Sequence, residues 1–231
     1  MKRIVEKIFT CLTVFSIIIV LFVTSIEVAI YMDFGFYEKE YEKYQVLDDL
    51  DMQMEEVMLV THEMMDYLHG KRDDLVVMTT VSGEKREFFN DREKQHMVDV
   101  KNIFLAGMQV RRVAVILMLG SLAILFFSKA KWKILVAKWY MGITCVLTVI
   151  GIGLGYLFAQ DFNTYFVKFH EIFFTNDLWI LNPDTDLMIR MLPEGFFADF
   201  SVRIGVFVAI AIFVCFVISF LVYYKEKTSN K

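Results

Sequence analysis

The sequence predicts a mainly α-helical integral membrane protein, with four transmembrane helices and a small α+β extracytoplasmic domain. Hydrophobic residues make up 57% of the 231 positions, which is too large a share for a soluble domain. The mean hydropathy is +0.49, and the chain has only two prolines. A helix needs roughly 20 apolar residues to cross about 30 Å of hydrocarbon. Four stretches meet this requirement: residues 8–30, 107–127, 134–158 and 202–224.

The first apolar stretch is preceded by Lys2, Arg3 and Lys7, as in a secretory signal peptide. However, the apolar run is longer than that of a signal peptide, and no small-residue cleavage pattern closes it. We therefore expect a retained membrane anchor.

The positive charges predict how the chain crosses the membrane. Lysine and arginine cluster before the first span, in the short loop 128–133 and after the fourth span. Cytoplasmic loops carry such an excess, so both termini and this loop are expected to be cytoplasmic. Residues 31–106 and 159–201 would then be extracytoplasmic. The net charge of −4 averages over the two sides, and no region is basic enough to indicate nucleic-acid binding.

The longer extracytoplasmic segment is expected to hold a helix followed by a β-hairpin. Asp48 or Asp49 is a candidate N-cap for a helix that Gly70 ends. The runs LVVMTTV and KREFF then flank a turn at Ser82 and Gly83, which is typical of a hairpin.

A second helix in this segment is expected to carry His96 into the membrane. Asn90 and Glu93 have the spacing of a capping box at its start. No break separates this helix from the span at 107–127, so His96 is predicted to lie on a rigid helical stalk.

The segment 159–201 is expected to begin with a helix lying in the headgroup plane. Its aromatic residues recur at helical spacing: Phe162, Phe166, Phe169 and Phe173. His170 falls on another face of this helix, close to Asn163, and is expected to point inward. Asn182 and Pro183 then predict the start of another short helix.

Arg111 and Arg112 lie about one turn inside the second span, where a charge is costly. Two interpretations remain open. Either both side chains snorkel to lipid phosphates, or at least one faces a polar cavity and pairs with Glu27. The third span contains small residues that favour close helix packing, or alternatively leave room for an acyl chain: Gly142, Gly151, Gly153 and Gly155.

A metal site is poorly supported by the sequence. His62 and His69 share a face of one predicted helix, and a metal site there would recruit His96 as a third ligand, but neither H-E-x-x-H nor H-x-x-E-H spacing occurs. Cys11, Cys145 and Cys215 each lie inside a span, which leaves no disulfide framework or thiolate site outside. We expect no metal and no cofactor.

Two imidazoles on one side of a membrane predict chemistry on a lipid or a lipidated substrate. Asp99 follows His96 by one helical turn, so its carboxylate is expected to fix the tautomer of that ring. No G-x-S-x-G motif is present, which argues against a serine hydrolase.

Two segments carry a resemblance to a known family: FFNDREKQHMVDVKNIF and FVKFHEIFFTNDLWILNPDTDLMIRMLPEGFF. Placed around four spans, they resemble bacterial integral membrane proteins that include the lipoprotein intramolecular transacylase of Gram-positive bacteria. The resemblance implies that the sn-2 acyl chain of a diacylglyceryl lipoprotein moves to the α-amino group of its N-terminal cysteine, giving a lyso-form lipoprotein. It also implies catalytic roles for His96 and His170, a location in the cytoplasmic membrane, and contact with membrane lipid.

The residues are compatible with this chemistry. We expect His96, steadied by Asp99, to act as the base and His170 to stabilise the oxyanion, although the residues alone leave the two roles interchangeable. Arg111 or Arg112 is a candidate substrate-binding residue, and Glu27 and Asn163 are candidate supporting residues.

Two other functions compete with this interpretation. One is a non-catalytic membrane sensor or assembly protein, which would use the acidic outer segment for binding. The other is a different lipid acyltransferase or lipase with the same two histidines. The oligomeric state remains open.

Overall fold

A computed structural model describes residues 2–128 and 131–229. The chain forms two compact units, each built from separate stretches of sequence. We call the first the spanning unit: Met1–Ala29, Met108–Gln160 and Arg203–Lys231. We call the second the histidine unit, because it contains all the histidines of the sequence: Ile30–Gly107 and Asp161–Val202.

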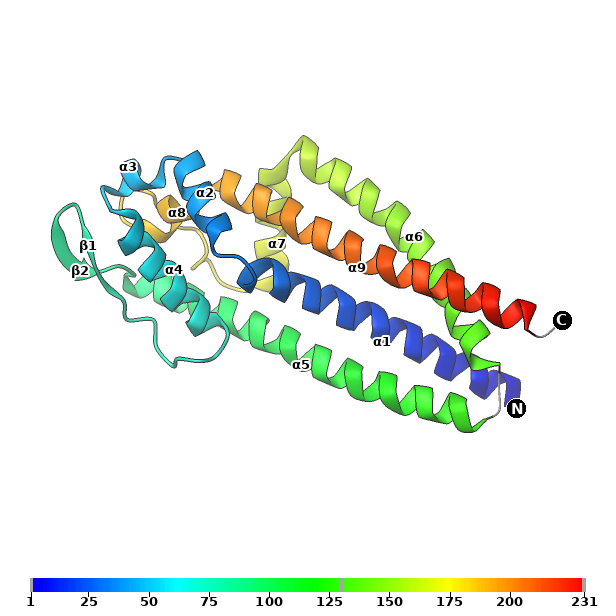
Figure 1. Ribbon diagram of the computed structural model, residues 1–231. Helices are drawn as coiled ribbons and strands as arrows, with labels where there is room; N and C mark the ends of the chain where they lie inside the picture. Colours follow the sequence, from blue (N-terminus) through cyan, green and yellow to red (C-terminus); the bar gives the residue numbers. More distant parts are fainter. Residues whose placement is uncertain (1, 129–130, 230–231) are drawn as a thin grey trace. The chain divides into compact units, whose positions relative to one another are not determined.

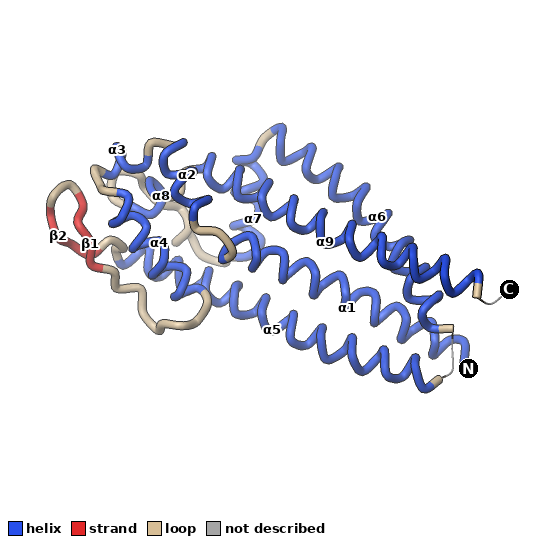
Figure 2. Tube along the Cα trace, viewed as in Figure 1, coloured by secondary structure: helices blue, strands red, loops and turns tan. Residues whose placement is uncertain are grey.

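The spanning unit is made from long helices (Figures 1 and 2). In the described residues, four helices are long and apolar enough to cross a membrane: α1 (Lys2–Tyr31), α5 (Asp91–Phe127), α6 (Trp132–Gln160) and α9 (Glu194–Thr228). Each predicted apolar stretch lies within one of them. The backbone N–H and C=O groups within a helix bond to one another, and the lipid interior offers no other partner for them. The predicted integral membrane class is confirmed.

Polar contacts link the helices of the spanning unit. The hydroxyls of Thr13 on α1 and Ser121 on α5 are 2.7 Å apart and buried. The Tyr140 hydroxyl on α6 donates to the carbonyl of Ile212 on α9 at 3.2 Å. Small hydroxyl residues of this kind let helices approach and bond to one another in lipid.

The glycines of α6 make no close helix contact among the described residues. A Cβ atom added at Gly142, Gly151, Gly153 or Gly155 would meet no atom within 4 Å in the described part of the chain. The predicted role of these glycines in close helix packing is therefore wrong for contacts inside the molecule.

The histidine unit contains short helices and one antiparallel hairpin. In chain order these are α2 (Gly35–Lys43), α3 (Val46–Leu50), α4 (Met54–Leu68), β1 (Met78–Val81), β2 (Glu84–Glu87), α7 (Phe162–Phe173) and α8 (Leu187–Met191).

The first predicted helix of this unit is split in two. Asp48 and Asp49 lie inside α3 instead of capping the longer helix. Asp51 adopts a left-handed conformation with φ 51°, which ends α3, and Gln53 is the N-cap of α4. The predicted N-cap is therefore wrong. Gly70, with φ 78°, follows the end of α4 as expected.

The hairpin is confirmed, with Val81 opposite Glu84 in the register of β1 and β2. Ser82 and Gly83 both have positive φ, at 51° and 78°. Two consecutive residues of this kind form the turn whose twist matches a two-residue hairpin.

The short helix predicted at Asn182 and Pro183 begins later. The backbone N–H groups of Thr185 and Asp186 both donate to the carbonyl of Asn182, which closes a turn. The helix itself, α8, starts at Leu187. The Asn-Pro pair therefore initiates a turn and not a helix.

The core of the histidine unit is rich in thioethers and aromatic rings. The cysteines lie outside this unit, in α1, α6 and α9. Methionine is flexible and fills irregular gaps between helices. The buried methionines of the unit are Met52, Met58, Met64, Met65, Met97, Met188 and Met191.

Candidate active site

The start of α5 is fixed by the predicted capping box. The backbone N–H of Asn90 donates to Glu93 Oε2 at 2.7 Å, and the N–H of Glu93 donates to Asn90 Oδ1 at 3.0 Å. The other carboxylate oxygen of Glu93 accepts the N–H of Met188 at 2.6 Å. Glu93 is fully buried, with 0% of its surface exposed. It therefore ties α8 to the turn of α5 that precedes His96.

His96 on α5 and His170 on α7 face each other in the histidine unit. Their ring centroids are 6.1 Å apart and the ring planes are inclined by 35°. Both side chains are buried, with exposed fractions of 6% for His96 and 8% for His170. Two residues 74 positions apart in the sequence thus form one buried imidazole pair.

The orientation of the His170 ring is set by its own helix. Asp161 caps α7 by accepting the N–H of Thr164 at 3.1 Å. His170 Nδ1 lies 2.7 Å from the carbonyl oxygen of Phe166. A carbonyl oxygen only accepts, so Nδ1 carries the hydrogen, and Nε2 of the neutral ring has a free lone pair. Burial lowers the pKa of His170, and this hydrogen bond partly opposes the effect. The neutral form is thus favoured at pH 7.

The surroundings of His96 differ from the sequence expectation. Its Nδ1 is buried and has no hydrogen-bond partner among the described residues. Asp99 instead accepts a hydrogen bond from Nδ2 of Asn176 at 2.8 Å. We expected Asp99 to fix the tautomer of His96, but the two side chains form no hydrogen bond in the described residues. An unbonded lone pair at Nδ1 is less costly than an unbonded N–H, which favours the His96 tautomer with its hydrogen on Nε2.

Aromatic rings enclose the histidine pair. Phe166 and Trp179 lie 4.3 Å and 4.9 Å from the His170 ring, centroid to centroid. Phe174 contacts both imidazoles, at 5.1 Å from His96 and 5.5 Å from His170. These rings were not expected at the site from the sequence. The signal was present, because Phe166 and Phe174 each lie four residues from His170.

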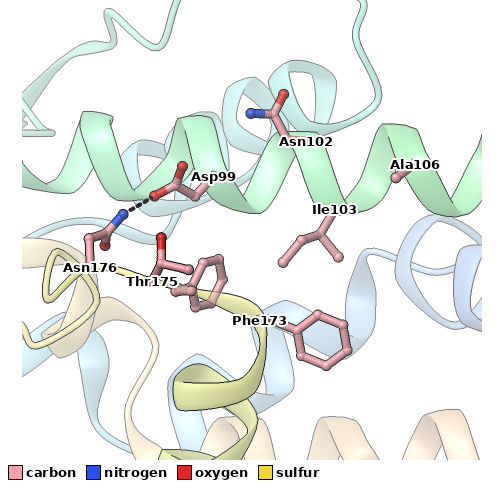
Figure 3. Close-up of a pocket in the computed structure, with 8 residues that line it drawn as sticks. Asp99, Asn102, Ile103, Ala106, Phe173, Thr175 and Asn176 are labelled. Atoms are coloured by element: carbon pink, nitrogen blue, oxygen red, sulfur yellow. Dashed lines mark hydrogen bonds between the residues drawn. The ribbon is translucent and has the colours of Figure 1, made fainter.

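A cavity of about 280 Å³ lies next to the pair, between α5 and the segment that follows α7 (Figure 3). Phe174 lines this cavity and also packs against both imidazoles, so it is a common wall of the two. The other lining residues are Asp99, Asn102, Ile103, Ala106, Phe173, Thr175 and Asn176.

Comparison with known proteins identifies the family. The profile of lipoprotein intramolecular transacylase Lit matches residues 11–197, which is most of the chain. The protein belongs to this family. It is therefore an acyltransferase, a lipoprotein intramolecular transacylase of the membrane, which excludes the competing non-catalytic function.

Solved structures of a transacylase from this family share the fold. The membrane integral lipoprotein intramolecular transacylase Lit from Bacillus cereus is 22% identical, with a TM-score of 0.77 over 96% of this chain and 98% of that one. Two variants of that protein, in which a histidine is replaced by arginine or by alanine, match with TM-scores of 0.72 and 0.73. The arginine variant is 22% identical over 97% of this chain and 94% of that one. The alanine variant is 23% identical over 96% of each chain. No curated protein matched the sequence.

The remaining predicted site residues of this transacylase lie elsewhere in the fold. Arg111 and Glu27 form the expected ion pair, with a second contact of 3.3 Å, inside the spanning unit. Arg112 is exposed and has no ion pair in the described residues. Asn163 is exposed on α7 and donates to Glu194 Oε2 at 2.9 Å. Only Asp99 joins the histidine pair and its cavity.

The other two histidines of the transacylase are held by aromatic residues. The His62 ring lies 4.1 Å from Phe34, and the His69 ring lies 5.1 Å from Tyr31. Among the described residues, no group of three His, Cys, Asp or Glu side chains is arranged to hold a metal ion.

Proposed function

We propose that the buried pair of His96 and His170 catalyses the transfer of the sn-2 acyl chain of a diacylglyceryl lipoprotein to the α-amino group of its N-terminal cysteine. The amine attacks the ester carbonyl, a C–N bond forms, and the C–O bond to the glyceryl oxygen breaks. The ammonium proton leaves first, and the glyceryl oxygen receives a proton at the end. The products are an amide and a free hydroxyl on the same molecule.

The observation that supports this proposal is the 6.1 Å separation of the ring centroids of two buried imidazoles, which both pack against Phe174, a residue that lines the neighbouring cavity. One proton acceptor and one hydrogen-bond donor at this distance can serve the two ends of an acyl transfer. Amine and ester belong to one molecule and are held close together, so no enzyme nucleophile is required.

The hydrogen bonding supports a different role for each ring. Nε2 of neutral His170 has a lone pair, because Nδ1 donates to Phe166. His170 therefore suits the base, which takes the ammonium proton and returns it to the glyceryl oxygen. His96, with its hydrogen on Nε2, suits the donor to the oxyanion. This assignment reverses the roles expected from the sequence.

The aromatic walls favour transfer over hydrolysis. Phe166, Phe174 and Trp179 cover the imidazole pair and limit the access of water. Water would compete with the amine for the ester carbonyl, as it does in a lipase. The enclosed site thus supports transacylation within one substrate.

The test is conversion of a synthetic diacylated lipopeptide by the purified full-length protein, followed by mass spectrometry. We expect His170→Gln to abolish conversion to the lyso-form, because an amide is not a base. We expect His96→Gln to retain a measurable fraction, because its side-chain N–H still donates. His62→Gln is the control and should convert normally. Full activity of the His170→Gln variant would exclude His170 as the base.

We also propose that the histidine unit is extracytoplasmic and that both termini are cytoplasmic, which the distribution of positive charges supports. In a background with Cys11, Cys145 and Cys215 replaced by alanine, Glu84→Cys should react with a membrane-impermeant maleimide in intact cells. Ser229→Cys should react only after permeabilisation. The opposite pattern would invert the topology.

A further inference from the structure

The cavity beside the histidine pair has a polar end and an apolar end. On α5, its lining residues are spaced by three, four and seven positions, so they share one helix face. Asp99 begins this row, and Ile103 and Ala106 continue it. The row spans about 10 Å at 1.5 Å per residue. Figure 3 shows Asp99 beside Asn176 at one end, with Phe173 opposite Ile103 further along.

Asp99 presents an unneutralised carboxylate to this cavity. Its side chain is half-buried, and one oxygen accepts the hydrogen bond from Asn176 at 2.8 Å. None of the salt bridges among the described residues involves Asp99, although Lys94 and Arg92 on the same helix pair with other carboxylates. The amide of Asn176 orients the carboxylate without cancelling its charge. A half-buried carboxylate is therefore left to attract a cation from outside the protein.

The position of this charge relates it to the proposed chemistry. Asp99 follows His96 by three residues on α5, and side chains at this spacing are neighbours, with Cβ atoms about 5–6 Å apart. Phe174 lines the cavity and packs against both imidazoles. A cationic group bound by Asp99 would lie at the edge of the histidine pair.

We propose that Asp99, oriented by Asn176, binds the α-ammonium group of the substrate's N-terminal cysteine, and that the cavity holds this residue before acyl transfer. Ile103 and Phe173 at the apolar end contact the thioether and glyceryl portion. The inference rests on the proposed function and adds the substrate group that is recognised. Asp99 is a binding residue here and does not take the ammonium proton, which passes to an imidazole.

This arrangement makes the free amino terminus a requirement for binding as well as for reaction. A lipopeptide whose amine is already acylated has no positive charge for Asp99. Such a peptide also places an amide against a carboxylate that has lost its hydration in part. The protein should therefore bind the unacylated form more tightly than an N-acylated form with the same lipid.

Binding of two unreactive probes tests the proposal. Both are dialkylglyceryl-cysteine lipopeptides, whose ether links cannot be transferred. One has a free amino terminus and the other is N-acetylated. The purified full-length protein should bind the free-amine probe about tenfold more tightly, as expected for one charged hydrogen bond. Equal binding of the two probes by the unmodified protein would overturn the proposal.

Three variants separate the charge of Asp99 from its shape. Asp99→Asn preserves the size of the side chain and an acceptor for Asn176, and it should lose the preference for the free amine. Asp99→Glu retains the charge and should keep part of the preference. Asp177→Asn removes an exposed carboxylate from the same region and should leave the preference unchanged. Full preference in Asp99→Asn, or equal loss in Asp99→Asn and Asp99→Glu, would contradict a charge-based site.

The outcome is independent of the histidine mechanism, because neither probe reacts. If His170→Gln loses conversion while Asp99→Asn keeps its preference, only the ammonium site is wrong. If Asp99→Asn loses its preference while the histidine variants convert substrate normally, only the catalytic assignment is wrong.

Discussion

The carboxylate of Glu93 accepts the backbone N–H of Met188 at 2.6 Å, across 95 positions of sequence. The same carboxylate accepts the N–H of Asn90 at 2.7 Å. One fully buried side chain therefore closes the start of α5 and holds the start of α8.

Loss of Glu93 should destabilise the histidine unit strongly. Glu93→Ala removes the acceptor for two backbone donors and leaves the N–H of Met188 buried without a partner. We expect a loss of roughly 3 kcal/mol, since hydrogen bonds to charged groups contribute about 1.5–3 kcal/mol. Thermal unfolding of the purified protein, followed by circular dichroism, measures this. Glu84→Ala, an exposed glutamate on β2, is the control. A Glu93→Ala variant that unfolds like this control would refute the structural role.

Burial of His170 should extend activity into mildly acidic conditions. Burial lowers the pKa of His170 below its ordinary value of 6.5, and a base works only when neutral. Activity is therefore retained as the pH falls to 6.5 and is lost when the pH passes the lowered pKa. Trp179→Ala removes a covering ring, so the pKa of His170 should rise and the acidic limb of the pH profile should shift upward.

The pH profile of lipopeptide conversion by both proteins checks this prediction. The substrate amine titrates near 7.7–8.0 and affects both profiles equally, so the difference between them reports on His170. Trp179→Phe keeps a ring in place and should shift the limb less. Superimposable acidic limbs for the unmodified protein and Trp179→Ala would show that this ring does not control His170.

Arg111 and Glu27 should stabilise the spanning unit only as a pair. Each side chain is about one quarter exposed, with 25% for both. Glu27→Leu leaves an arginine without its partner, which costs about 3 kcal/mol for a largely buried pair. The double variant Glu27→Leu/Arg111→Leu should recover most of that loss, because neither charge remains. Arg112→Leu is the matched control. Additive losses in the double variant, measured by thermal unfolding in detergent, would contradict the coupling.

Gly195 is expected to tolerate no side chain. A Cβ atom there would overlap the ring of Tyr44, whose hydroxyl donates to Asp199 at 2.6 Å. Gly195→Ala should therefore destabilise the protein by about 1–3 kcal/mol, as overpacking does. Gly205→Ala on the same helix meets no atom within 4 Å and should be neutral or slightly stabilising. Thermal unfolding of the two variants compares them directly, and equal melting temperatures would disprove the close packing.

Local patterns predicted much of the fold. The apolar stretches, the hairpin at Ser82 and Gly83 and the capping box of Asn90 and Glu93 each depend on neighbours in sequence, so the sequence is enough to recognise them. The break before α4 depends on left-handed backbone at Asp51, a residue type that favours this conformation only weakly. It could not be read from the pattern.

The site could be predicted only in part, because some of its contacts join residues that lie far apart in the sequence. The resemblance to a family pointed to His96 and His170, and the structure brings the two rings together. The hydrogen bonds around the two rings could not all be predicted from the sequence. Asp99 has a neighbour in His96 but bonds to Asn176, which is 77 positions away. Only the tertiary fold determines which of these two residues forms a hydrogen bond with the carboxylate.

The methionine-rich core of the histidine unit can be oxidised only under one condition. Met64 and Met191 are fully enclosed, so peroxide reaches them only when the unit opens. Oxidation then converts an apolar side chain into a polar sulfoxide that does not fit the space it left. A brief opening, otherwise reversible, would become lasting chemical damage. Resistance to peroxide should therefore follow how firmly this unit stays closed.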